Sequence, residues 1–332
     1  MVIAMKILRI TALGVFLLCA ALLLPSCASV KKIGSNAIAT MLAGSNKKGH
    51  PVKKRADDPD VLAVVTGESD TVLVGEFFPT ALKLYEIMQA SNPDHQGLAV
   101  MTGSLNVMYA NAFVQAPAER IPDDQFDRRY AEEKRAKMHY LRGRDYILAV
   151  FDTRYPGFKA AMLSSDEAAI QDFVAKLTER DVDAAYWCAA GALGAFALDP
   201  LDADLIGCLQ GPVAMLERAA ALAPDYSDGA IWQVLTAFYA AAPVDFGGDV
   251  ERARACYDEA VRVSGGKSAG VYITYAESFC IPANDKAGFE EALAKALAIN
   301  PDDDPSSRLM TLISQEKAQH LLEIEDEYFV EW

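Results

Sequence analysis

The stretch "FEEALAKALAINP", residues 289–301, decides the fold of this 332-residue chain. Leu293 and Ala296 lie three residues apart, and Pro301 closes the run. Apolar residues at three- and four-residue intervals indicate one face of an α-helix, and a proline beyond the last of them is a stop signal. The stretch therefore predicts a helix that packs along one side and ends before Pro301.

The same stretch fits the second helix of a tetratricopeptide unit, a pair of packed helices with large and small residues at set positions and a helix-ending proline. Leu293 takes a large position and Ala296 a small one, whereas Phe289 occupies a position that is usually small. The segment before it, "VYITYAESF", supplies the first helix with Tyr272, Tyr275, Ala276 and Phe279. Together they predict a helix hairpin.

Degenerate copies of this pattern occur earlier in the chain. They are "IWQVLTAFY" with Ala253, Tyr257 and Ala260; "YWCAAGALGAF" with "PVAMLERAAALAP"; and "TALKLYEIMQASNP". Stacked hairpins of this kind bury a continuous core. The fold class is therefore predicted as all-α, a superhelix of TPR-like helix hairpins with a C-terminal capping helix near residues 305–328, whose charges lie opposite its apolar side.

The segment "SGGKSAG", residues 264–270, resembles the end of a phosphate-binding loop, but Val261 stands where such a loop needs a glycine. A helix also precedes it, because apolar residues in "VERARACYDEAVRV" recur with helical spacing. We interpret the glycines as the turn between two helical repeats.

Three further helices are expected between the hairpins. Two are long, at residues 97–115 and 124–151, and a third begins at "SSDEAAIQDFVAKL". In this third helix Ser164 and Glu167 have the spacing of a capping box.

The N-terminus has the form of a lipoprotein leader. Lys6 and Arg9 precede an apolar run, and "LPSC" ends at Cys27. The predicted domains are a signal peptide at 1–26, a lipidated basic tether at 27–57 and a TPR-like α-helical domain at 58–332. An ordinary signal peptide and an uncleaved membrane anchor are the alternatives.

Charge divides the chain sharply. Residues 28–56 hold seven Lys and Arg and no acid, whereas residues 57–332 hold 22 Lys and Arg against 46 Asp and Glu. The basic tether would suit anionic lipid, or it is simply a solvated linker. The acidic body argues against nucleic acid as a partner.

Residues that carry chemistry form no recognisable catalytic or metal-binding pattern. The four histidines, at 50, 95, 139 and 320, lack metal-ligand spacing, and no nucleophile elbow or zincin motif occurs. We expect no enzyme activity, no metal and no cofactor. The cysteines at 188, 208, 256 and 280 are expected to be buried thiols, although a disulfide stays open.

Recognition would then depend on the concave surface of a helical superhelix. Eight residues are candidates to contact a ligand or line a pore, each with packing or an ion pair as the alternative: Tyr109, Asn111, Arg142, Arg144, Trp187, Trp232, Tyr239 and Tyr275.

Several ordered motifs, among them "YANAFVQ" (109–115), "LRGRDY" (141–146), "APDYSDGAIW" (223–232) and "SGGKSAGVY" (264–272), resemble the T-component family of TRAP transporters. The resemblance covers about residues 58–328. It implies an all-α body with cryptic tetratricopeptide motifs, a channel through each protomer and a homotrimer. It also implies partnership with a periplasmic TRAP substrate-binding protein and a hydrophobic or organic-acid ligand.

The predicted function is therefore that of a periplasm-facing lipoprotein, the accessory component of a TRAP-type system, anchored by lipid to a bacterial membrane. The alternative is a structural tetratricopeptide lipoprotein that scaffolds envelope assembly by binding peptides.

Overall fold

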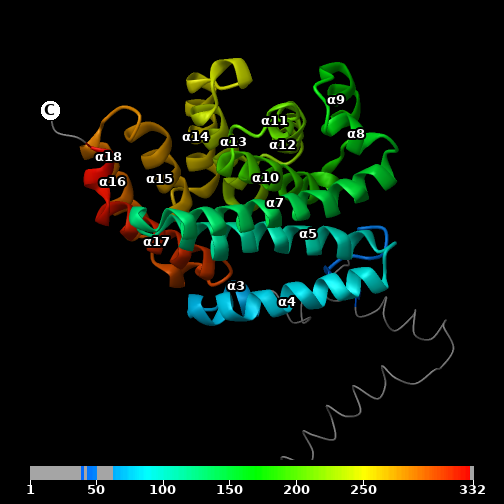
Figure 1. The fold of residues 1–332 in the computed structure, drawn as a ribbon, viewed down its shortest axis with the longest axis horizontal. Coiled ribbons are helices and arrows are strands. Elements are labelled where there is room, and N and C mark those ends of the chain that lie inside the picture. The colour runs from blue at the N-terminus through cyan, green and yellow to red at the C-terminus, as the bar shows by residue number, and fades with distance from the viewer. Residues whose placement is uncertain (1–38, 41–42, 51–62, 330–332) are drawn as a thin grey trace, which may run out of the picture.

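The computed structural model describes residues 39–40, 43–50 and 63–329. The leader, Cys27 and most of the tether lie outside the described residues. Within them the chain forms helices joined by turns, so the prediction of an all-α fold is confirmed (Figure 1). Regular tetratricopeptide geometry stays a prediction.

The N-terminal half is built of long helices with short ones between them. These are α3 (Ala63–Thr66), α4 (Thr71–Ser91), α5 (Gln96–Ala110), the π-helical segment η1 (Asn111–Gln115), α6 (Ala116–Glu119), η2 (Asp123–Gln125), α7 (Phe126–Arg154), α8 (Phe158–Met162), α9 (Glu167–Val174) and η3 (Glu179–Asp181).

The C-terminal half is built of hairpins. Its elements are α10 (Val182–Leu198), α11 (Ala203–Ile206), α12 (Gln210–Leu222), η4 (Tyr226–Gly229), α13 (Ala230–Ala241), η5 (Val244–Phe246), α14 (Val250–Ser264), α15 (Ala269–Tyr275), the π-helical segment η6 (Ala276–Cys280), α16 (Lys286–Leu297), η7 (Pro301–Asp303), α17 (Arg308–Glu323) and α18 (Glu325–Tyr328).

The predicted hairpins are present. α10 packs on α12, α13 on α14, and α15 on α16. The turn between the last two hairpins is the "SGGKSAG" segment: α14 ends at Ser264, and Gly265 and Gly266 have φ of 59° and 73°. These left-handed angles favour glycine, so the interpretation of this segment as a turn is confirmed.

The two long helices lie close to their predicted bounds. The helix expected at 97–115 runs from Gln96 and continues through η1 and α6 to Glu119. By length and composition this helix could cross a membrane, but 67% of its most apolar window is buried in protein, between neighbours that include α4, α7 and α10. It is placed as a core helix.

The start predicted for the third helix was wrong. α9 begins after Asp166, whose Oδ1 accepts a hydrogen bond from the backbone N–H of Ala169 at 3.0 Å. Ser164 instead accepts from the N–H of Asp166 at 3.2 Å. Aspartate is as good an N-cap as serine and stands nearer the first periodic residue.

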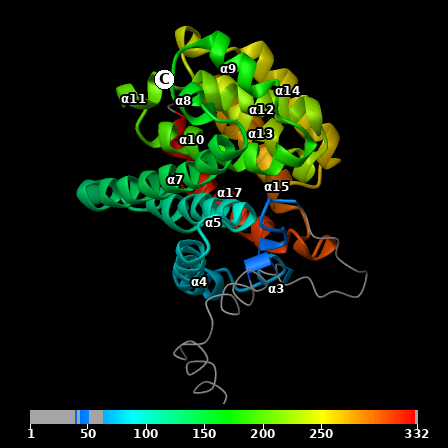
Figure 2. The ribbon, with the colours of Figure 1, turned by 90° about the vertical axis from the view of Figure 1, so that its right-hand side faces the viewer.

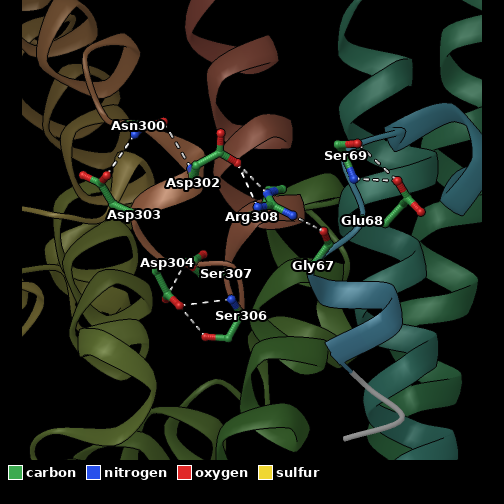
Figure 3. A network of polar contacts seen from close by, with 10 residues as sticks. All are labelled: Gly67, Glu68, Ser69, Asn300, Asp302, Asp303, Asp304, Ser306, Ser307 and Arg308. Atoms are coloured by element: carbon green, nitrogen blue, oxygen red, sulfur yellow. Dashed lines mark hydrogen bonds and ion pairs between the residues drawn. The ribbon is translucent and has the colours of Figure 1, made fainter.

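Neighbouring helices form a closed circuit. Contacts pass from α4 to α5, α7, α10, α12, α13, α15, α16 and α17, and α17 then packs against α3 and α4. Figure 3 shows this closure: Arg308 donates from Nη1 to the carbonyl of Gly67 at 2.8 Å and pairs with Asp302. The N-terminal helices α3 and α4 and the C-terminal helix α17 are thus neighbours.

α17 lies against α4 through apolar and polar contacts on one face. Leu309 and Ile313 are buried beside Val74 and Phe78 of α4. Glu316, three residues after Ile313 and therefore on the same face, accepts from Thr71 Oγ1 at 2.8 Å and pairs with Arg120 at 3.3 Å. The role of this helix as a cap stays a prediction.

Cys188, Cys208, Cys256 and Cys280 are all buried and free, as the buried-thiol prediction requires. Burial raises the pKa of the Cys188 thiol to about 12. These cysteines therefore act as small apolar side chains.

Candidate functional site

A continuous chain of polar side chains joins the two π-helical segments. Asn111 Nδ2 donates to Tyr140 Oη at 3.1 Å, and Tyr140 Oη donates to Gln115 Oε1 at 2.7 Å. Gln115 Nε2 donates in turn to Glu119 Oε1 at 2.9 Å. Lys317 Nζ lies 3.6 Å from Glu119 Oε2 and 2.8 Å from Glu277 Oε1. We call these six residues the polar chain.

The local backbone explains how the polar chain is positioned. η1 carries Asn111 and Gln115, and η6 carries Glu277. A π-helical turn holds an extra residue and turns the side chains that follow it relative to an α-helix, and such turns recur at functional sites. Tyr140 comes from α7 and Lys317 from α17, so helices far apart in the sequence meet here.

Its two carboxylate neighbours keep Lys317, at the centre of the polar chain, ionised. Burial lowers the pKa of the Lys317 ammonium, but Glu277 and Glu119 outweigh burial and hold this pKa above its usual value. The side chain of Lys317 is still 28% accessible. A lysine with two carboxylate neighbours carries its charge at every physiological pH, and the three groups together are net negative.

A second polar group lies on α10. Asp183 accepts a hydrogen bond from Tyr226 Oη at 2.7 Å, and the Tyr226 ring lies 5.3 Å from that of Tyr186. Burial raises the pKa of the Asp183 carboxyl even though the residue is exposed to solvent. This carboxyl is thus open to solvent on one side and next to the Tyr226 hydroxyl on the other.

The two groups are neighbours. Trp187 packs against the core cluster that contains Tyr140, and its ring lies 5.0 Å from that of Tyr186. The polar chain and the Asp183 group therefore lie in one region of the protein.

Three of the eight predicted contact residues lie in or beside this region. Asn111 is exposed and belongs to the polar chain. Trp187 is half-buried and lies with its ring 5.0 Å from Tyr186. Trp232 Nε1 donates to the carbonyl of Pro224 at 2.8 Å, next to the turn that carries Tyr226.

The other five lie elsewhere. Tyr109 and Tyr239 are buried, with Tyr109 stacked on Phe78 and Tyr239 donating to Glu217 at 2.7 Å. Tyr275 packs its ring 4.9 Å from Tyr257. Arg142 and Arg144 are in ion pairs, with Glu86 at 3.1 Å and Asp145 at 2.9 Å respectively. Ligand contact by any of the eight stays a prediction.

A groove of about 1000 Å³ follows the outer side of α7. Arg142 and Glu86 lie in it, and its other walls mix apolar, acidic and basic side chains from α4, α7 and the end of α10. A smaller pocket of about 220 Å³ lies between α13 and η6 and includes Glu277 of the polar chain.

Sequence reasoning missed Lys317, Glu119 and Glu277. Their residue types and spacing resemble those of ordinary surface charges, and only the folded chain brings them together. The signal that was present is the motif "YANAFVQ", which holds both Asn111 and Gln115.

Comparison with known proteins adds the family. A family model described as the TRAP transporter T-component matches residues 67–329, which is most of the described body. This chain belongs to the TRAP transporter T-component family. A relative of this T-component, an uncharacterized protein of Treponema pallidum (strain Nichols), is 42% identical over 274 residues, covering 82% of this chain and 85% of that protein. T-components are accessory parts of a transporter and are not a known enzyme family, so this chain has an accessory role in TRAP transport.

Proposed function

We propose that this T-component is a lipoprotein anchored through Cys27, faces the periplasm, binds the substrate-binding protein of its TRAP system and passes a ligand along its interior. The family match over residues 67–329 is the observation that carries the proposal. The leader pattern supports the anchor. Assembly as a homotrimer is part of the same proposal.

The interior favours a hydrophobic ligand over an organic acid. A carboxylate ligand needs a cation whose charge is not already shared, yet Lys317 is paired with both Glu119 and Glu277. The aromatic rings of Tyr186, Trp187 and Tyr226 offer apolar surface beside it. A neutral long-chain molecule would thus need no unpaired cation to bind there.

Capture of partners tests the role. The full-length lipidated protein, purified from membranes with its partners crosslinked, is expected to bring down a periplasmic solute receptor, and its native mass is expected to be that of three copies. Recovery of envelope-assembly factors without any solute receptor would overturn the transport role and favour a peptide-binding scaffold.

Ligand passage has its own test. A fluorescent, uncharged long-chain alcohol is expected to bind the wild-type protein, and Lys317→Met, which leaves two carboxylates unpaired, is expected to weaken this binding several-fold. Lys295→Met is the matched control, because Lys295 pairs with Glu291 on an exposed helix face. Equal binding by the two variants, or tighter binding of a fluorescent dicarboxylate than of the alcohol, contradicts the proposal.

A further inference from the structure

α4 has two apolar faces. Val74, Phe78 and Leu82 are buried on one side, towards α5 and α17. On the other side four apolar residues are each more than half exposed: Leu73, Phe77, Leu84 and Ile87. Their spacing of four, seven and three residues places them on one face of the helix. We call these four residues the outer stripe of α4.

A helix that is apolar on opposite sides is normally covered on both. The outer stripe extends about 21 Å along the helix axis, and neighbouring Val72 and Val64 are exposed as well. Figures 1 and 2 both place α4 at the edge of the molecule, on the far side of α5 from α7. Among the described residues, none covers its outer face, as the exposures of the stripe show.

The segment before the helical body packs against the C-terminal end of α4. Ala39 and Ala43 are buried in one cluster that includes Tyr85 and Met88 of α4. Thr40 Oγ1 is 3.1 Å from His95 Nε2, just beyond the end of α4. The backbone N–H of Gln96 also donates to the carbonyl of Lys47 at 3.0 Å. Residues 39–40 and 43–50 of the segment predicted as a tether are thus packed on the body.

This packing shortens the tether. Only residues 28–38 separate Cys27 from Ala39. Fully extended, these twelve steps span about 40 Å, and as a flexible coil they average about 20 Å. If Cys27 carries the lipid, as the proposed function requires, the α4–α5 end of the body cannot leave the neighbourhood of the bilayer.

We propose that the outer stripe of α4 rests on the phospholipid bilayer that holds the anchor. Its four apolar side chains would enter the boundary between headgroups and acyl chains, as those of interfacial helices do. Exposed Lys47 and Lys48, which follow Ala43, would meet anionic headgroups. Such a stripe binds weakly alone, but the tether makes the contact intramolecular and raises its effective concentration. The short tether limits the distance between α4 and the bilayer, whereas nothing holds a second copy or a soluble receptor near this helix. This favours the bilayer as the partner.

The test measures the depth of one residue in a membrane. The full-length lipidated protein is reconstituted in vesicles of phosphatidylcholine and phosphatidylglycerol, with an environment-sensitive dye on Leu84→Cys. The other cysteines of the described body are buried and leave this position to the dye. The matched control is Val250→Cys on α14, an apolar residue of similar exposure, 55% against 53%. A quencher attached to the acyl chains is expected to reduce emission at position 84 several-fold more than at position 250.

A second variant separates contact from anchoring. Adding Phe77→Glu and Ile87→Glu is expected to abolish quenching at position 84 while the protein still floats with the vesicles. Equal quenching at positions 84 and 250 in protein that floats overturns the α4 contact and leaves the anchor intact. Wild-type protein that does not float overturns both. A dye at position 84 that is shielded before vesicles are added overturns the contact in favour of a second copy.

Discussion

His139 is a buried residue whose protonation the fold opposes. Its Nδ1 lies 3.0 Å from Asn106 Oδ1, and its ring meets Tyr109 edge to face. Burial, helped by Arg142 and Arg135, lowers the pKa of His139 from 6.5 to about 4. Folding therefore holds this imidazole neutral.

Lowering the pH should therefore destabilise the protein. The unfolded chain takes up the His139 proton at a higher pH than the folded chain does. The stability is fully present above about pH 6.5 and is lost as pH falls towards about 4, with a slope of up to about 1.4 kcal/mol per pH unit. Urea unfolding across this range should give a shallower slope for His139→Gln than for wild type. His50→Gln, at an exposed position, should keep the wild-type slope, and a wild-type slope in His139→Gln would refute the assignment.

The residues of the candidate site differ in how well the sequence predicts them. Asn111 was selected from the motif at 109–115 as a ligand-contact residue, which stays a prediction, and the π-helical turn that begins at Asn111 could not be foreseen from the sequence. Lys317 could not be chosen, because its partners Glu119 and Glu277 come from other helices and no local pattern links them. Local spacing predicts which face of a helix is apolar, and contacts across the fold decide which charges turn inwards.

At the scale of elements, α5, α7 and α10 cross at glycines. A Cβ on Gly143 would lie 2.6 Å from the carbonyl oxygen of Gly103, and one on Gly191 would lie 2.8 Å from the carbonyl oxygen of Tyr140. Both neighbours are backbone atoms, which cannot move aside alone. Small residues at these crossings thus set the distance between the helices. Helix-repeat units also need small residues where two helices pack closely.

Gly143→Ala should therefore separate α5 from α7. We expect a loss of about 1–3 kcal/mol in the free energy of unfolding, the usual range for overpacking, offset slightly by the better helix propensity of alanine. Urea unfolding measures it. Gly207→Ala is the control, since its Cβ would meet nothing nearer than 3.3 Å, at the carbonyl oxygen of Ala203. Similar stability of the two variants would show that the helices can shift without cost.

The elements also show where sequence patterns reach their limit. The long helices and hairpins were located well, because apolar spacing over ten or more residues is a strong signal. The start of α9 was predicted wrongly, because several polar residues near the start of a helix compete for the N-cap position.

At the scale of the whole molecule, the circuit of helices is completed by α17. Leu309 is 2% exposed and lies in the same core cluster as Val74 and Phe78 of α4. Contacts between the two ends of the body therefore contribute to its core, in addition to the polar contacts of Arg308 and Glu316.

Leu309→Ala should loosen both ends together. The lost contacts and the cavity are expected to cost about 2–5 kcal/mol, and amide hydrogen exchange should speed up in α4 as well as in α17. Ile170→Ala in α9, which removes an equally buried side chain away from this closure, should destabilise the protein without a selective effect on α4. Faster exchange confined to α17 would mean that the circuit is not cooperative.

The meeting of Arg308 with Gly67 joins residues 241 positions apart. No such contact can form while the chain is still being made or exported, so α4 must wait with its inner apolar face incompletely covered until the last helices emerge. Contacts between residues so far apart in the sequence form late, slow folding and prolong the lifetime of aggregation-prone intermediates. A polypeptide cut short before α17 would keep that face bare, which gives quality-control proteases a direct way to tell a finished copy from an unfinished one.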